Sequence, residues 1–308
     1  MTRKLSLLFV VALTALLLAA CGGDSGGGIV TTDPDSPYPL TVRQSDGQEI
    51  TIRKRPERIV SLSAHATEIF CAIGAGSQLV AVEQYANCPL GSSAKPQLDG
   101  FSPSLEAIAS YRPDLVYVSS NSGDVVQGLR RLGMPVLYLE LPASLGGVLE
   151  QIRFLGNVAG RAQEAGALTN QMERRIDAVR QKVASISRGP RVYHELDTTY
   201  FTVAPGSFVG DLYVFLKAEN IAAGASSPYP QLSAEVIVQR NPQVIVLADE
   251  AAGVTADSVR ARPGWSVIEA VRNNRICIVD PDIVSRPGPR IVDGLEALGR
   301  CLYPEQFR

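Results

Sequence analysis

One helix-then-strand unit occurs twice in the sequence, once in each half of the chain. Residues 104–118 read SLEAIASYRPDLVYV, and residues 233–247 read SAEVIVQRNPQVIVL. In both copies a serine leads, a glutamate follows two places later, a proline ends the helical stretch, and a β-rich apolar run comes next. The repeat predicts two similar α/β lobes, with one copy of the unit in each.

Strands and helices alternate on both sides of this repeat. In the first half we expect strands at 59–63, 79–82, 115–118 and 136–141, and helices at 67–75, 105–111 and 125–132. In the second half we expect strands at 191–196, 244–248 and 276–279, and helices at 208–216, 234–239 and 291–302. Alternation at this spacing predicts parallel sheets with helices on both faces.

Two further segments complete the expected layout. Residues 39–52 alternate around Asp46-Gly47, which predicts a β-hairpin with a tight turn. Residues 145–186 contain no proline and predict a long helical segment, interrupted near Gly160. The predicted fold is therefore two parallel-sheet α/β lobes joined by a single long helix, with a ligand cleft between the lobes. Its expected divisions are a signal peptide (1–20), a lipidated flexible tether (21–38), an N-terminal lobe (39–144), a connecting helical segment (145–189) and a C-terminal lobe (190–308).

The N-terminus has the features of an export signal. Two basic residues precede an apolar run, at 7–18, that is too short for a comfortable membrane span. Small residues then lead to Cys21, which resembles the lipidation site of bacterial lipoproteins, and a glycine-rich stretch follows. We expect an extracytoplasmic protein anchored to a membrane through lipid on Cys21. The alternative is a plain signal peptide with a chance cysteine.

Charge and cysteine content narrow the possible partners. Without residues 1–20 the chain carries 27 basic and 31 acidic residues, a net charge of −4, which is unlike a nucleic-acid-binding protein. The spacing of the remaining four cysteines matches no zinc pattern. The local pairs are Cys71–Cys88 and Cys277–Cys301, although all four could equally be buried free thiols.

In this layout the chain resembles the substrate-binding proteins of ABC importers whose lobes are joined by a rigid helix, the vitamin B12, siderophore and haem group. The resemblance covers nearly the whole mature chain. It is carried by these stretches, taken together in order and spacing: RPERIVSL at 55–62, LE at 105–106, RPDLV at 112–116, YPQLS at 229–233, Glu235, NP at 241–242 and RPGPR at 286–290.

The resemblance gives the repeated glutamates a role. In the family each lobe offers one glutamate to arginines of the permease, which implies that Glu106 and Glu235 dock onto the two permease subunits, with the ATPase subunits behind them. Two matching carboxylates suit a two-fold partner that presents arginines. The alternative is that both glutamates only favour the first turn of a helix.

The ligand is expected beyond the carboxyl ends of the strands. Matched to the B12-binding relatives, Tyr85, Phe201 and Tyr229 fall on aromatic pocket positions, and Asp282 and Arg286 on polar ones. Further candidates for the cleft are His65, Phe101 and Tyr200. Such aromatics suit a flat metal chelate. Any one of them can instead belong to the core.

Some positions depart from the family pattern. Gly100 and Ser119 stand where tryptophans align, and Trp265 is the only tryptophan. The resemblance implies cobalamin or a related corrinoid as the transported ligand. The less aromatic cleft leaves a ferric siderophore, whose negative charge suits Arg286 and Arg290, or haem as the alternative. His65 is a candidate ligand for the chelate's metal, and Glu68 is expected at a helix start. No resident metal or cofactor is expected.

Two other classes of function compete with a carrier. A tetrapyrrole chelatase has the same architecture, but the chain has two histidines, no Gly-x-Ser-x-Gly outside the glycine-rich stretch at 22–28, and no phosphate loop. We therefore expect no catalytic residues and no enzyme activity. A purely structural lipoprotein is the third option, and it predicts that no ligand binds.

Overall fold

The structure is a computed structural model that describes residues 29–30, 37–88 and 95–308. The expected signal peptide, Cys21 and most of the expected tether lie outside the described residues. Among the residues that are described, no helix is long and apolar enough to cross a membrane.

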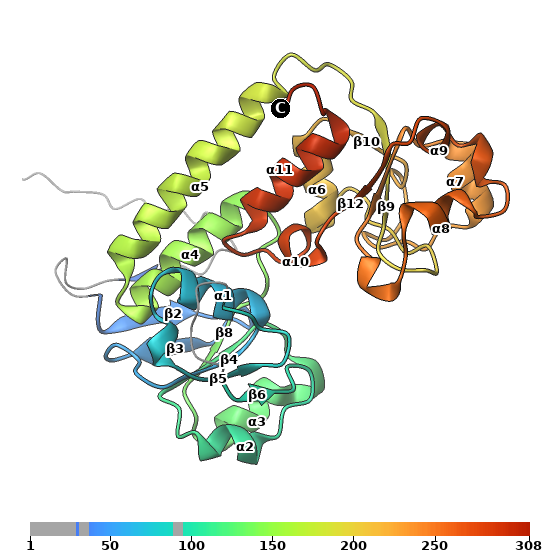
Figure 1. The fold of residues 1–308 in the computed structure, drawn as a ribbon. Coiled ribbons are helices and arrows are strands. Elements are labelled where there is room, and N and C mark those ends of the chain that lie inside the picture. Colours follow the sequence, from blue (N-terminus) through green and yellow to red (C-terminus); the bar gives the residue numbers. More distant parts are fainter. Residues whose placement is uncertain (1–28, 31–36, 89–94) are drawn as a thin grey trace, which may run out of the picture.

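The fold is built on two parallel sheets, one at each end of the molecule (Figure 1). Strands β4, β7 and β11 are buried at every position, as expected when helices cover both faces of a sheet. The first sheet has the order β6-β5-β4-β7-β8, with β4 Ile59–Leu62, β5 Leu79–Glu83, β6 Gln97–Leu98, β7 Leu115–Val118 and β8 Val136–Tyr138. The second has the order β10-β9-β11-β12, with β9 Arg191–Glu195, β10 Glu219–Asn220, β11 Val244–Leu247 and β12 Ile276–Ile278.

Helices cover both faces of each sheet. In the first lobe, α1 (Ala64–Ala72) and α4 (Leu145–Ala159) pack on one face, and α2 (Leu105–Ser110) and α3 (Val125–Arg131) on the other. In the second lobe, one face packs against α6 (Phe208–Phe215) and α11 (Ile291–Leu302), and the other against α7 (Ala234–Arg240), α8 (Ala256–Arg260) and α9 (Glu269–Arg272). The two inner faces belong to one continuous apolar core.

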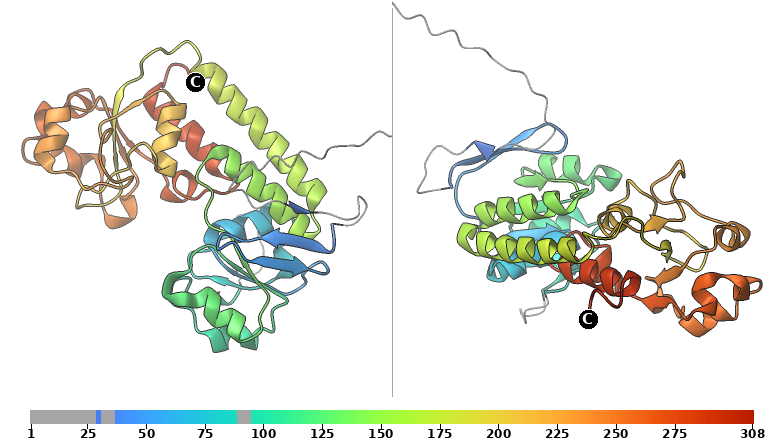
Figure 2. Two further views of the ribbon diagram at one scale, coloured as in Figure 1. Left: turned by 180° about the vertical axis from the view of Figure 1, so that it is seen from behind. Right: turned by 90° about the horizontal axis from the view of Figure 1, so that it is seen from above.

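The connecting segment is two helices and not one. Helix α4 ends at Gly160, whose φ of +65° lies in the left-handed region, and α5 (Ala162–Lys182) then packs back along α4. Helix α5 alone spans about 30 Å. It reaches from the first lobe to the second beside α11 (Figure 2), and Arg175 on α5 pairs with Asp293 at 2.6 Å and Glu296 at 2.9 Å. The interruption expected near Gly160 is therefore present, and the two lobes are connected by two helices that pack against each other.

Shorter elements frame this core. The expected hairpin forms from β2 (Leu40–Arg43) and β3 (Glu49–Ile52), and β1 (Ile29–Val30) pairs with its edge. The two-residue strands β6 and β10 and the short helices α8, α9 and α10 (Pro281–Val284) were not expected, because segments this short carry little periodicity.

The cysteines divide into one bonded pair and one free pair. Cys71 and Cys88 form a disulfide, with Cα atoms 5.7 Å apart, whereas Cys277 and Cys301 are free thiols. Their thiols contact each other, and the hydrogen bond between them lowers the pKa of Cys277. Of the two local pairings considered from the sequence, the structure contains the first.

Candidate functional site

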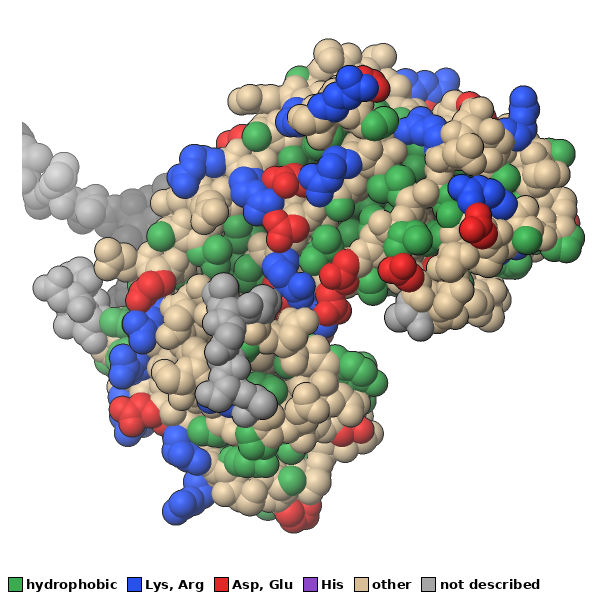
Figure 3. All heavy atoms as spheres, in the orientation of Figure 1, with side chains coloured by type: hydrophobic (Ala, Val, Ile, Leu, Met, Phe, Trp, Pro, Cys, Tyr) green, Lys and Arg blue, Asp and Glu red, His purple; other side chains and the backbone are tan. Residues whose placement is uncertain are grey.

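A hollow separates the two lobes, and a pocket of about 390 Å³ lies within it (Figure 3). Its walls are residues at or after the ends of β4 to β8 in the first lobe, together with segment 281–287 after β12 of the second. The pocket thus lies at the carboxyl ends of strands, where ligands bind in open α/β folds.

The pocket brings together five of the eight candidate cleft residues. Tyr85 and Phe101 are 63% and 64% exposed, so large rings stand uncovered at its wall. The five are His65, Tyr85, Phe101, Asp282 and Arg286. Gly100 and Ser119, where tryptophans were expected from the family, also line the pocket and leave it wider than two indoles would.

The other three candidates belong to the second lobe and do not line this pocket. Phe201 and Tyr229 have exposed rings, and their segments are joined because Phe201 bridges to Gln231. Tyr200 is different. Its ring lies 5.8 Å from that of Trp265, and the guanidinium of Arg262 lies 5.2 Å from its centroid. Tyr200 is therefore half-buried against the core of the second lobe.

His65 is a buried, neutral part of the pocket wall. Its Nδ1 lies 2.6 Å from Ser63 Oγ, and its Nε2 lies 3.0 Å from Gln151 Oε1 and 3.3 Å from the Tyr117 hydroxyl. Burial lowers the pKa of His65 to about 4. Both ring nitrogens already have partners, which argues against the hypothesis that His65 ligates a metal.

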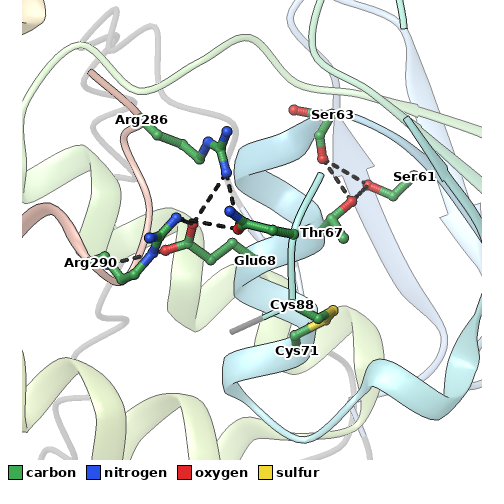
Figure 4. The surroundings of a disulfide bond; sticks show 9 residues. Ser61, Ser63, Thr67, Glu68, Cys71, Cys88, Arg286 and Arg290 are labelled. Atoms are coloured by element: carbon green, nitrogen blue, oxygen red, sulfur yellow. Dashed lines mark hydrogen bonds and ion pairs between the residues drawn. A yellow bond between two sulfur atoms is a disulfide. The ribbon is translucent and has the colours of Figure 1, made fainter. Parts of the chain in front are cut away.

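An ion-pair network ties the first lobe to the segment around α10 and α11. Glu68 on α1 is 2% exposed and lies 2.9 Å from Arg290 and 3.7 Å from Arg286 (Figure 4). The expectation that Glu68 is a helix-start residue is wrong. Ser63 is the extended residue before α1, which begins at Ala64, so Glu68 lies in the second turn and points to the arginines.

Arg286 is held on several sides. Its guanidinium donates to Asp282 at 2.8 Å, to the Tyr85 carbonyl at 3.2 Å and to Asn87 Oδ1 at 3.2 Å. Asp282 also accepts from the Asn87 amide at 3.1 Å. Both arginines of the network therefore already face carboxylates before any ligand arrives.

The disulfide fixes the loop that carries these contacts. Cys71 lies one turn after Glu68 on α1, and its partner Cys88 (Figure 4) follows Tyr85 and Asn87 in the connection after β5. The covalent bond thus holds a pocket aromatic and two acceptors of Arg286 against the helix that carries Glu68. Nothing in the sequence alone indicated this link between a cysteine pair and the cleft.

The second lobe has its own buried acid at a strand end. Glu195, the last residue of β9, accepts two hydrogen bonds from Arg262, at 2.5 and 2.6 Å. Asp249 is buried nearby, just after β11, and burial raises its pKa to about 7. Across the described ranges, no group of three or more His, Cys, Asp or Glu side chains is arranged to hold a metal ion.

The repeated glutamates lie elsewhere. Glu106 and Glu235 are exposed in the first turns of α2 and α7, and neither lines the pocket. Ser104 caps α2 by accepting from Ala107 N–H at 3.1 Å, and Ser233 caps α7 by accepting from Val236 N–H at 3.3 Å. The two units therefore present a carboxylate to solvent in the same local setting.

The comparisons with known proteins agree with this geometry. The profile of the periplasmic binding protein family matches residues 59–283. The chain belongs to this family. The ABC transporter substrate-binding lipoprotein YvrC of Bacillus subtilis is 30% identical over 317 residues, which cover 100% of both chains. A cobalamin-binding protein of Halobacterium salinarum is 29% identical over 97% of this chain and 85% of its own length.

Solved structures of the family show the same fold with different ligands in their descriptions. The vitamin B12-binding protein BtuF of Vibrio cholerae is 27% identical, with a TM-score of 0.71 over 82% of this chain and 98% of its own. The haem-binding protein RhuT of Roseiflexus is 28% identical, with a TM-score of 0.71 over 82% and 99%. The identification of the chain as an ABC-importer substrate-binding protein with two parallel-sheet lobes is confirmed.

Proposed function

We propose that this protein captures a corrinoid, cobalamin or a close relative, and delivers it to an ABC permease. The observation that carries the proposal is a pocket with exposed aromatic rings and compensated charges. Tyr85 and Phe101 expose large apolar surface in a concave site, and Phe201 and Tyr229 do so on the other lobe. Such surface is typical of a site that a flat, bulky ligand covers.

The charges favour a corrinoid over the alternative ligands. Among the described residues that line the pocket, Arg286 is the one cation, and it is already bonded to Asp282. Arg290 is bonded to Glu68. Haem carries two propionates and many ferric siderophores are anionic, so either would need a cation that these carboxylates already occupy. The amide-rich, largely neutral edge of a corrinoid has no such need.

We propose a lipid anchor and permease docking for the parts of the protein outside the pocket. Lipid on Cys21 would hold the protein at the extracytoplasmic membrane surface, as the lipoprotein relative supports. Glu106 and Glu235 would then pair with arginines of two permease subunits, coupled to the ATPase subunits. Their exposure and matching environments support this role. No catalytic residue is proposed.

The decisive experiment is retention of a coloured ligand. The mature chain is incubated separately with cyanocobalamin, haem and a ferric catecholate siderophore, and is then separated from free ligand by gel filtration. We expect the visible bands of cyanocobalamin to elute with the protein. Retention of haem or the siderophore alone would assign the alternative ligand, and retention of none would contradict the carrier function.

A matched pair of variants then places the ligand. Phe101→Ala removes an exposed ring at the pocket, whereas Leu132→Ala removes an exposed apolar side chain that does not line it. We expect the first variant to weaken cyanocobalamin binding by about tenfold, and the second to leave affinity unchanged. Equal affinities for both variants would place the ligand elsewhere.

A further inference from the structure

Glu83 is a buried acid in the pocket wall that the proposed function has not yet used. It is the last residue of β5, lines the pocket two residues before Tyr85, and is 5% exposed. Gly100 lies against it: a Cβ at Gly100 would stand 3.3 Å from Glu83 Oε2 and 3.2 Å from its Cβ. Because Gly100 has no side chain, the Glu83 carboxyl group fits against it in the pocket wall.

One oxygen of the carboxyl group lacks a hydrogen-bond partner. Glu83 Oε1 is buried and accepts no hydrogen bond from any residue that the structure describes. Burial raises the pKa of Glu83, against the opposing effects of the Tyr85 backbone N–H and Arg286. A buried polar oxygen without a partner costs free energy and is uncommon in native proteins, so a donor supplied by a ligand would offset that cost.

The nearby arginine does not supply the missing partner. Arg286 donates to Asp282, to the Tyr85 carbonyl and to Asn87, and no hydrogen bond joins it to Glu83. The other charged groups around Glu83 are Asp99 and Asp282, which are acids and repel a second negative charge. Glu83 thus lines the pocket and has one carboxyl oxygen without a donor, which suits it to an N–H donor brought by a ligand.

We propose that Glu83 recognises a primary carboxamide on the edge of the bound ligand and selects against a carboxylate at that position. The inference rests on the proposed corrinoid function, because corrinoids carry several carboxamide side chains around the ring. A carboxamide has both an N–H donor and a carbonyl acceptor, so it pairs with the carboxyl group in either protonation state. A carboxylate pairs only with the protonated form and is otherwise repelled.

The test compares cyanocobalamin with its monocarboxylic derivatives, in each of which one amide has been hydrolysed. Dissociation constants are measured for each ligand with wild type, Glu83→Gln and the control Glu49→Gln, an exposed residue of β3. We expect wild type and the control to bind at least one derivative about tenfold more weakly than cyanocobalamin. In Glu83→Gln the preference should fall to about twofold, because the glutamine amide donates to a carboxylate.

A second measurement separates ligand recognition from a structural role. Glu83→Gln removes an unpartnered buried acid, so the melting temperature of the free protein should stay equal or rise. A lower melting temperature together with an unchanged ligand preference would assign Glu83 to structure and overturn the inference. If wild type binds cyanocobalamin and every monocarboxylic derivative with equal affinity, the inference about Glu83 is wrong and the corrinoid function stands. Binding of only haem or a ferric siderophore overturns both the inference and the corrinoid function.

Discussion

The two lobes match around the repeated helix-then-strand units, residues 104–118 and 233–247, whereas their cleft-lining parts differ. The repeated units share more than a serine cap and a glutamate. In the first lobe Asp114 accepts from Arg58 N–H at 2.8 Å, and the Arg58 guanidinium donates to the Tyr111 carbonyl at 2.6 Å. In the second lobe Gln243 accepts from Arg191 N–H at 3.1 Å, and Arg191 Nε donates to the Asn241 carbonyl at 3.0 Å. Each unit is thus fastened to the neighbouring strand in the same way.

At the cleft ends each lobe buries a glutamate, but its partner comes from a different place. Glu68 in the first lobe pairs with Arg290, which is 222 residues away along the chain. Glu195 in the second lobe pairs with Arg262 of the same lobe, whose guanidinium also lies 4.6 Å from the Trp265 ring centroid. The first pair joins two parts of the cleft, and the second lies against the aromatic core of the second lobe.

The contrast has a physical reason. Two permease subunits related by a two-fold axis would present the same surface twice, so one similar unit in each lobe could make the same contact with each subunit. A ligand held between the lobes has no such symmetry, and nothing requires the two cleft walls to be alike. The comparison between the repeated units and the cleft therefore supports the proposal that the former dock onto the permease and the latter binds the ligand.

The largest expected effect is on transport. Glu106→Ala and Glu235→Ala should each reduce ligand-stimulated ATP hydrolysis by the reconstituted importer, because each leaves a permease arginine without its partner, at a cost of about 2–5 kcal/mol if that charge is buried on docking. Ligand affinity and melting temperature should be nearly unchanged, since both carboxylates are exposed. Full stimulation by the double variant would contradict the docking role, and a loss in only one single variant would break the symmetry.

The next effect tests the two buried glutamates by removing their arginines. Arg262→Met should lower the free energy of unfolding by about 3–5 kcal/mol, because Glu195 has no exposed side-chain surface and no second arginine pairs with it in the described structure. Arg290→Met should cost less, since Arg286 remains 3.7 Å from Glu68. Chemical denaturation of both variants measures the difference. Equal losses would mean that Arg286 does not compensate for the missing Arg290.

The disulfide provides a third comparison between the lobes. Replacing Cys71 and Cys88 with serine should cost about 3 kcal/mol, as expected for a loop closed over 17 residues, and should also weaken ligand binding through the loop that carries Tyr85. The matched control replaces the free thiols Cys277 and Cys301 with serine in the second lobe. A reducing agent should lower the melting temperature of wild type and of this control, but not of the Cys71/Cys88 variant.

The last expected effect is acid sensitivity, with one histidine in each lobe. Burial lowers the pKa of both His65 and His194 to about 4, from an unfolded value of about 6.5. Because the folded pKa is lower, the stability they contribute is present above about pH 6.5 and is lost as the pH falls toward 4. Melting temperatures between pH 7 and 4 should fall less steeply for His65→Gln and for His194→Gln than for wild type. Parallel curves for wild type and either variant would show that the corresponding imidazole does not titrate in this range.

Local signals in the sequence predicted the sheets and most helices. The strand β7 and the helix α11 begin and end at the residues expected, because a proline before an apolar run and an amphipathic period are local properties. The start of α1 was misplaced by three residues, and with it the role of Glu68. Ser63, which precedes the helix, makes no side-chain cap bond, so the usual signal of a helix start is missing.

The sequence by itself determined the two-lobed plan, the repeated helix-then-strand unit and most of the residue types in the cleft. Only the tertiary structure decided which polar side chains have partners. Glu68 pairs with an arginine from the far end of the chain, both ring nitrogens of His65 are bonded to neighbours, and Glu83 Oε1 has no donor. Helices and strands follow from residues a few places apart, whereas the pairing of a buried charge depends on which side chains the finished fold brings within about 3 Å.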